Sequence, residues 1–256
     1  MHSRKGFVHH SRMHLGVQLF TLRDVMDKDL AGTLRKVGEA GYRYVETAGL
    51  HGRTPEEFRR ELDAAGLQAV ACHVGLPEVE ERLDENARIA EVLGVEWLVV
   101  PWIPKEAYEG GWAKFGERLG VVAKNVIAKG LKFGYHNHAF EFEPENGVPG
   151  YELLWQGAPE TVEAEIDVYW AQHAGHDPAN WLRRLAGRVP LAHFKDGRDG
   201  TMTPVGEGDL DWPGIIAAAK LAGVQYAIVE LDECPRDPVE CVVASYNYLN
   251  GLGVAR

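Results

Sequence analysis

The chain repeats one two-part unit eight times, and this repeat limits the folds open to it more than any other feature. Each unit begins with an apolar run of strand length. It continues with a stretch in which apolar residues recur every three or four positions, as in an amphipathic helix. Glycine closes most of the helical stretches, for example Gly41, Gly66, Gly94 and Gly130. Successive apolar runs begin about 30 residues apart, which is the size of a βα unit in a parallel sheet.

Eight such units in 256 residues predict a single (β/α)8 TIM barrel over residues 14–256. The expected strands are 15–20, 42–47, 67–74, 96–101, 131–138, 161–167, 189–194 and 225–231. Thr54 and Asp177 are each followed by proline, which is the usual start of a helix. The pattern also predicts one continuous helix over 77–93 and loops over 143–150 and 196–208. Residues 1–13 contain no apolar segment of signal-peptide length, and we expect a disordered N-terminal extension there.

Composition excludes several classes of partner. The formal net charge is −11, from 38 acidic and 27 basic residues, and no basic stripe is present, so we expect no nucleic-acid partner. No apolar run approaches the length of about 20 residues that spans a bilayer, so we expect no membrane partner. Three cysteines without a CxxC spacing argue against a disulfide framework and against a thiolate zinc site. They favour a reducing compartment, and we expect a cytoplasmic protein.

Four potential metal ligands stand at the ends of four consecutive expected strands: His136, Asp167, His193 and Glu230. Any one of them is explained equally well as a polar residue where a strand meets solvent. Four in succession favour a metal site, because the carboxyl ends of all strands of a barrel meet at one rim. Two imidazoles and two carboxylates suit one divalent metal ion, such as Mn, Zn, Co or Mg, with positions left open for substrate oxygens.

Other polar or aromatic residues lie at or just beyond strand ends and are expected to bind substrate: Gln18, Glu46, His73, Trp102 and Trp170. The two tryptophans either stack on the apolar face of a sugar ring or fill the barrel mouth.

Lys195 follows His193 by two residues and therefore has the same orientation in a strand. Its ammonium group either holds an anionic part of the substrate or pairs with Asp196 or Asp199 at the surface. His138 is likewise two residues beyond His136.

Five motifs carry a resemblance to a known family: Leu-Gly-Val-Gln-Leu-Phe-Thr-Leu-Arg-Asp (15–24), Tyr-His-Asn-His-Ala-Phe-Glu-Phe (135–142), His-Phe-Lys-Asp (193–196), Gly-Glu-Gly-Asp-Leu-Asp-Trp (206–212) and Glu-Leu-Asp (230–232). With them the chain resembles the sugar phosphate isomerase/epimerase family of xylose isomerase-like TIM barrels, which includes ketose 3-epimerases and inosose dehydratases. The resemblance implies a metal held by Glu, Asp, His and Glu from strands five to eight. His136 stands where the first Glu is usual, as in the inosose dehydratases, and Glu141 is the alternative ligand from that strand.

The resemblance implies a metal-dependent sugar isomerase or epimerase that acts on a ketose, keto-inositol or sugar phosphate through an enediolate. The alternatives are an inosose dehydratase, a 3-ketoglycoside lyase or hydratase, and a non-catalytic sugar-binding barrel. A DNA-repair endonuclease branch of this scaffold needs a basic face, which the net charge argues against.

Within this chemistry, Glu230 is the expected base and Lys195 the next candidate. His138 is the expected second acid or base, unless its ring only hydrogen bonds to Glu46 or Glu141. The partner is a small sugar or cyclitol, and the sequence leaves the oligomeric state open, a homo-oligomer included.

Overall fold

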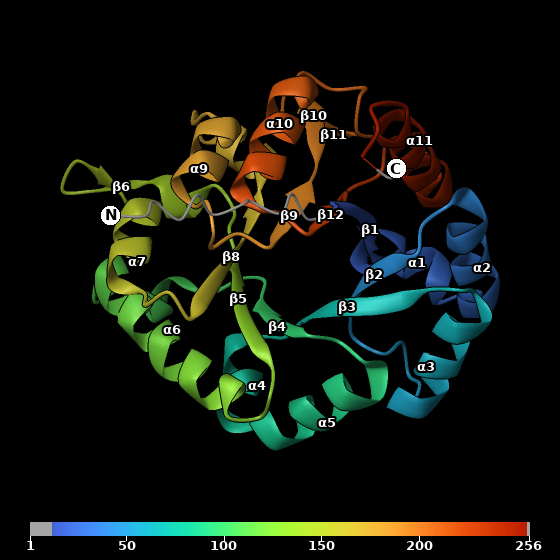
Figure 1. Cartoon of the computed structure of the whole chain (residues 1–256), viewed down its shortest axis with the longest axis horizontal. Coiled ribbons are helices and arrows are strands. Elements are labelled where there is room, and N and C mark those ends of the chain that lie inside the picture. Colours follow the sequence, from blue (N-terminus) through green and yellow to red (C-terminus); the bar gives the residue numbers. More distant parts are fainter. Residues whose placement is uncertain (1–11, 255–256) are drawn as a thin grey trace, which may run out of the picture.

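Eight parallel strands close into a barrel, which confirms the predicted fold. The computed structural model describes residues 12–254, and helices form a ring outside the strands (Figure 1). The order around the barrel is β1-β12-β9-β8-β5-β4-β3-β2. The strands are β1 His14–Gln18, β2 Tyr44–Ala48, β3 Gln68–His73, β4 Trp97–Val100, β5 Lys132–His136, β8 Val162–Asp167, β9 Leu191–Phe194 and β12 Tyr226–Val229. Most of the predicted extension lies outside the described residues, although Met13 at its end is buried in the core.

The helices follow the strands in the predicted alternation. They are α1 Arg23–Met26, α2 Leu30–Ala40, α3 Pro55–Ala64, α4 Leu76–Glu81, α5 Leu83–Leu93, α6 Trp112–Ile127, α7 Gly150–Gly157, α8 Val168–His173, α9 Pro178–Arg184, α10 Trp212–Ala222 and α11 Pro238–Gly251, with three short 3-10 turns at Leu19–Leu22, Lys105–Ala107 and Phe140–Phe142. Thr54 begins α3 with a capping box, since its side chain and that of Glu57 each bond to the other's backbone N–H. The helix expected over 77–93 is instead two helices, because the backbone of Arg82 leaves helical geometry.

Two short hairpins stand where we expected loops. They are β6 Pro144–Glu145 with β7 Val148–Pro149, and β10 Asp196–Arg198 with β11 Thr201–Thr203. The second is held by buried Asp196, whose carboxylate accepts the backbone N–H of Gly206 at 2.8 Å and the indole N–H of Trp212 at 2.7 Å. Asp196 therefore organises the loop that leads to α10.

The inside of the barrel has an apolar part and a polar part. Val70, Ala71, Trp97, Val99, Leu191 and Ile228 form a small hydrophobic cluster of their own. Polar residues lie nearer the carboxyl ends of the strands, where the strand register sets His136 beside Glu165 and Asp167 beside His193. All four are buried, so the fold places ionisable groups in contact away from water.

Two further findings bear on the composition. None of the helices within residues 12–254 is long and apolar enough to cross a membrane. Cys72, Cys234 and Cys241 are all free thiols, as their spacing in the sequence led us to expect.

Candidate active site

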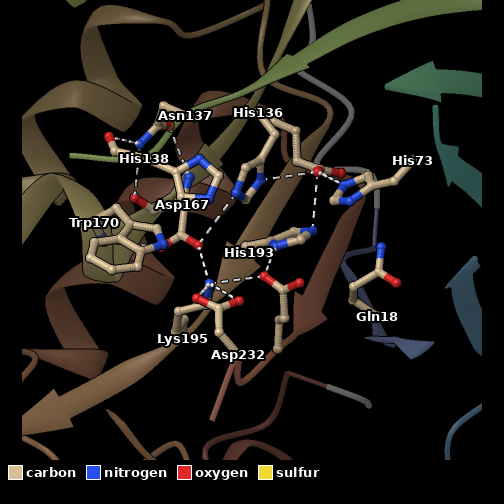
Figure 2. A network of polar contacts seen from close by, with 12 residues as sticks. Gln18, His73, His136, Asn137, His138, Asp167, Trp170, His193, Lys195 and Asp232 are labelled. Carbon is tan, nitrogen blue, oxygen red and sulfur yellow. Dashed lines mark hydrogen bonds and ion pairs between the residues drawn. The ribbon is translucent and has the colours of Figure 1, made fainter. Parts of the chain in front are cut away.

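The structure brings the four candidate metal ligands together. His136 and Asp167 end β5 and β8, His193 lies in β9, and Glu230 directly follows β12. One donor atom from each of the four lies within 4.8 Å of the donor atoms of the others, and all four residues are buried. Figure 2 shows His136, Asp167 and His193 pointing toward one another from their separate strands.

Local hydrogen bonds fix the carboxylate of Asp167. Its Oδ1 accepts the backbone N–H of Trp170 at 3.0 Å and so caps α8, while its own N–H donates to Asn137 Oδ1 at 3.0 Å. Its Oδ2 is buried at 3.7 Å from His136 Nε2 and 3.0 Å from Lys195 Nζ, without an aligned hydrogen bond among residues 12–254. Two buried carboxylates beside two imidazoles are a donor set that fits a divalent cation.

Lys195 lies against the same carboxylates. Its Nζ is 3.0 Å from Asp167 Oδ2, 2.9 Å from Glu230 Oε2 and 3.0 Å from Asp232 Oδ2. The side chain is fully buried, which alone would lower the pKa of Lys195, but the three carboxylates raise that pKa above its ordinary value. The ammonium group is therefore a permanent buried cation. The alternative in which Lys195 pairs with Asp196 or Asp199 at the surface is not what the structure shows.

Glu165 lies beneath the four ligands. Its Oε1 is 2.8 Å from His73 Nε2, to which it is hydrogen bonded, and lies 3.0 Å from His193 Nε2 and 3.2 Å from His136 Nδ1 without a hydrogen bond to either. Together with these three histidines it forms a second set of potential metal ligands that shares two imidazoles with the first.

Gln18 and Glu46 do not line the substrate pocket as predicted. Both are fully buried, and Gln18 Nε2 donates to Glu46 Oε1 at 2.7 Å. The same Glu46 oxygen lies 2.7 Å from His193 Nε2 and 3.0 Å from His73 Nε2. They lie in β1 and β2, in the layer below the mouth, where Gln18 holds Glu46, Glu46 holds the two imidazoles, and neither has surface to offer a substrate.

The charges of the two shared imidazoles differ. Burial alone would lower the pKa of His193, but Glu165, Glu230 and Glu46 raise it well above its usual value. Burial, helped by the cationic His193, lowers the pKa of His136 well below its usual value. His136 is therefore neutral at physiological pH and keeps a lone pair for a metal, whereas His193 has to lose a proton first.

The two carboxylate ligands differ as well. Burial alone would raise the pKa of Glu230, but Lys195 and His193 hold it well below its ordinary range. Burial raises the pKa of Asp167 to about 6. Both are carboxylates at neutral pH, so the set supplies two anionic oxygens.

A cavity of about 430 Å³ opens above the ligands. It is lined by Phe20, Ala48, Gly49, His73, Pro101, Trp102, His136, His138, Glu230 and Asp232. The predicted wall residues His73 and Trp102 are among them. Neither lysine nor arginine is among these lining residues, so the charged and ionisable groups of the cavity wall are the carboxylates of Glu230 and Asp232 and the imidazoles of His73, His136 and His138.

A second cavity of about 610 Å³ adjoins the first and shares Trp102 and His138 with it. Its wall is mostly aromatic: Trp102, His138, Phe140, Phe142 and Trp170, with Ala139, Glu143, Pro144 and Ala174. Trp102 stands at the junction with 55% of its surface exposed. Trp170 lines this second cavity with its buried indole N–H unpaired among the described residues, and its ring lies 5.5 Å from Lys195 Nζ.

Glu141, the alternative ligand from the fifth strand, faces away from the centre. Its Oε1 accepts the phenol O–H of Tyr135 and its Oε2 the backbone N–H of His138, both at 2.8 Å. Burial raises the pKa of Glu141 to about 8, so the group is largely protonated at neutral pH. In the described chain, the fifth strand thus contributes His136 to the ligand cluster, and Glu141 does not belong to it.

The imidazole of His138 lies at the mouth, T-shaped to that of His136 at 5.1 Å between ring centroids. Burial, with the nearby Lys195, lowers the pKa of His138 to about 4. This was not expected, since the prediction of an acid or base role assumed titration near neutral pH. The side chain is a neutral hydrogen-bonding group at that pH.

Comparison with known proteins now places the chain. A family model described as xylose isomerase-like TIM barrel matches residues 34–245. The chain belongs to the xylose isomerase-like TIM barrel family.

Relatives of this xylose isomerase-like protein differ in activity. An inosose dehydratase from Geobacillus kaustophilus (strain HTA426) is 26% identical in an alignment of 203 residues that covers 70% of this chain and 66% of the relative, just under two thirds of the relative's length. A sugar phosphate isomerase/epimerase from Parabacteroides distasonis ATCC 8503 has a similar structure, with a TM-score of 0.85 and 23% identity over 98% of this chain and 100% of the other. The IOLI protein with a bound zinc atom has a TM-score of 0.68 and 16% identity over 95% of this chain and 98% of the other. At sequence identities of 23% and 16%, structural similarity shows that the fold is shared.

Three residues of this xylose isomerase-like site were not singled out from the sequence. Glu165 lies two positions before the predicted ligand Asp167, and Asp232 lies two positions after the predicted ligand Glu230. Residues two apart in a strand point to the same face, so this spacing could have identified both. Asn137 lies between His136 and His138, just beyond the end of β5, and bonds to the backbone of Asp167, a contact between neighbouring segments that spacing along one strand does not reveal.

Proposed function

We propose that the protein is a metal-dependent enzyme that removes the proton next to the carbonyl group of a keto sugar or keto-cyclitol and then eliminates a β-hydroxyl group as water. The observation that carries this proposal is the arrangement of acids and bases around the first cavity. Its carboxylates, Glu230 and Asp232, both come from the end of β12, and the facing wall supplies imidazoles and Trp102.

His136, Asp167, His193 and Glu230 would hold the ion. A divalent ion there would polarise a ketone and stabilise negative charge as it develops on the substrate oxygens. Glu230 is the proposed base. Its Oε2 is held by His193 at 2.8 Å and Lys195 at 2.9 Å, which orients the carboxylate toward the cavity that it lines. Lys195 does not line the cavity, and its role in this proposal is to hold the carboxylates of Glu230 and Asp232.

The acid–base groups favour elimination over epimerisation. Epimerisation needs a second group that protonates the opposite face of the substrate carbon, and no carboxylate lies on that side of the cavity. Glu141 is hydrogen bonded away from it, and His138, with a pKa lowered to about 4, is a poor proton carrier at neutral pH. Elimination needs a proton only at the departing hydroxyl. Asp232 lines the cavity next to Glu230 and is the proposed donor once it has taken up a proton; before that it is a carboxylate paired with Lys195, and burial raises its pKa.

The same cavity favours an uncharged substrate. Lysine and arginine are absent from its lining, and Lys195 already contacts three carboxylates. A phosphate would meet Glu230 and Asp232 without a free cation to pair with. Inososes and unphosphorylated ketoses therefore fit better than sugar phosphates, in keeping with the inosose dehydratase relative.

The test is to incubate the protein with Mn²⁺ in D₂O with an inosose or with D-fructose and to follow the products by ¹H NMR. We expect loss of the inosose proton beside the carbonyl together with a dehydrated product. Glu230→Gln keeps the shape of the side chain and should slow the reaction by about 10² or more while the ion still binds. Glu233→Gln, an exposed neighbour, is the matched control and should be unchanged. An accumulating epimer or isomer without dehydration would refute the elimination and restore the activity predicted from the sequence.

The second, aromatic cavity favours one alternative, a 3-ketoglycoside lyase. The chemistry would be the same β-elimination, with an alcohol as the leaving group in place of water. A single keto sugar fills only the cavity above the ligands, whereas a glycoside could place its second ring in the adjoining cavity of about 610 Å³, against Trp102 and Trp170.

This alternative predicts that 3-keto-cellobiose is consumed faster than an inosose, with release of glucose. Trp170 lines only the second cavity, so Trp170→Ala should raise KM for the disaccharide by roughly tenfold, which corresponds to one lost stacking contact, and leave the inosose reaction unchanged. Equal effects on both substrates would contradict a role for the second cavity.

A further inference from the structure

Two overlapping sets of potential ligands share the imidazoles of His136 and His193. The upper set is His136, Asp167, His193 and Glu230, and the lower set is His73, His136, Glu165 and His193. An ion can be bound by either set on distance alone, so the structure has to contain something that decides between them.

The two sets use opposite nitrogens of the shared rings. His136 has Nε2 at 3.7 Å from Asp167 Oδ2 in the upper set and Nδ1 at 3.2 Å from Glu165 Oε1 in the lower. His193 has Nδ1 at 2.8 Å from Glu230 Oε2 and Nε2 at 3.0 Å from Glu165 Oε1. A neutral imidazole has one lone pair and one N–H, so a ring that binds an ion in one set presents an N–H to the other.

The surroundings favour an ion in the upper set. His73 and His136 of the lower set line the cavity, as His136 and Glu230 of the upper set do, but only the upper set has a carboxylate in the cavity wall. An ion held there can keep positions open for a substrate. Glu165 is fully buried and lines none of the cavities described above. When the ion is above, the lower nitrogen of each ring carries the hydrogen, and Glu165 Oε1 is the carboxylate oxygen within reach of both.

We propose that Glu165 is the positioning residue of the metal centre, because its Oε1 lies within 3.2 Å of the lower nitrogen of both His136 and His193. With an ion above, it would accept the N–H of each ring there and so direct the lone pairs of both rings to the upper set. The inference rests on the metal site of the proposed function. A carboxylate behind a metal-bound imidazole fixes its tautomer and ring orientation and makes it a stronger donor. Glu46 shares the Nε2 of His193 at 2.7 Å, whereas His136 has Glu165 as its carboxylate on this side, so His136 depends on Glu165 more.

Two substitutions separate the charge of Glu165 from its hydrogen bonding. Glu165→Gln keeps an oxygen acceptor and removes the charge, and Glu165→Leu removes both. We expect the Kd for Zn²⁺, measured calorimetrically against a competing chelator, to rise by about 10- to 100-fold in the Leu variant and by less in the Gln variant. Glu163→Gln is the control. Glu163 is on the same strand and face, but accepts the indole N–H of Trp97 at 2.6 Å and touches neither ring.

A second readout does not depend on affinity or activity. In ¹⁵N-histidine NMR spectra of the Zn²⁺-loaded wild type, we expect His136 to be bound through Nε2 and His193 through Nδ1. The variants should show loss of this pattern at His136 first. Ions bound through the opposite nitrogens, or Glu165 variants with the wild-type Kd and pattern, would overturn the positioning role and leave the metal site standing. A wild type that binds no divalent ion would instead refute the metal-dependent function itself, and the inference with it.

Discussion

Replacing Lys195 by Met should destabilise the metal-free protein and make it depend on a bound ion. The ammonium group lies within 3.0 Å of carboxylate oxygens of Asp167, Glu230 and Asp232 and is completely buried. Met keeps most of the apolar stem but leaves these carboxylates without their cation. Breaking a buried ion pair by removing one partner costs about 3–5 kcal/mol. For a domain of this size, that corresponds to a loss of about 6–20 °C in Tm.

A divalent ion should recover much of this loss, because it supplies positive charge to two of the same carboxylates. At a concentration of about 100 times Kd, an ion stabilises the folded state by about 2.7 kcal/mol. The gain should be larger in the variant than in the wild type, since the ion no longer faces the repulsion of the Lys195 ammonium group. Differential scanning calorimetry with EDTA or with Mn²⁺ measures both quantities.

Lys129→Met is the matched control for Lys195→Met. Lys129 pairs with Asp84 at the surface, where both side chains are largely exposed, so its loss should cost less than about 1 kcal/mol. The reasoning would be wrong if metal-free Lys195→Met unfolded within about 2 °C of the wild type, a shift of at most about 1 kcal/mol for this size. It would also be wrong if Mn²⁺ raised the Tm of both proteins equally.

Two further predictions follow from pKa shifts. Burial raises the pKa of Glu141 from its ordinary 4.5 to about 8 in the folded protein. Between pH 4.5 and 8 the folded state therefore holds a proton that the unfolded state has lost, and the free energy of unfolding falls as pH rises through this range. The free energy of unfolding of Glu141→Gln, relative to that of the wild type, should therefore increase from pH 5 to 8 by on the order of 4 kcal/mol and stay constant above pH 8. Urea titrations across this pH range measure the difference, and a difference that does not change with pH would contradict the prediction. The raised pKa of His193 means that a metal displaces a proton, so Zn²⁺ binding near pH 7 should release about one proton per ion and weaken as pH falls. Calorimetry in two buffers of different ionisation enthalpy measures the release, and no dependence on the buffer would refute it.

The barrel could be predicted from the sequence because its signals are local. Each strand and helix shows its own periodicity, and caps such as Thr54 mark where a helix begins. The break at Arg82 was missed because the apolar pattern continues across it, and nothing in the neighbouring residues marks a change of backbone conformation. The hairpin at Asp196 was missed for a different reason: its bonds to Gly206 and Trp212 join residues ten or more positions apart.

The site was predictable to the extent that it depends on strand ends. The proximity of His136, Asp167, His193 and Glu230 follows from the rule that the carboxyl ends of barrel strands share one rim. The depth of a side chain below that rim depends on register between strands, which one sequence does not give. The sequence therefore predicted correctly that Glu46 points into the barrel, but not that it lies below the substrate cavity. For the same reason, Glu165 was not expected beside His136.

The charges of the whole centre restrict what it can bind. Burial alone would lower the pKa of His73, but Glu46 and Glu165 raise it to about 10, so His73 is a buried cation like Lys195 and the protonated His193. Against these cations stand the carboxylates of Glu46, Glu165, Asp167, Glu230 and Asp232. A divalent ion that displaces the proton of His193 adds a single positive charge overall, which brings the centre near balance but leaves no excess of positive charge. An anionic substrate would have to enter against this field, whereas a neutral ketone would gain a cation-stabilised site for the negative charge that develops only during proton removal.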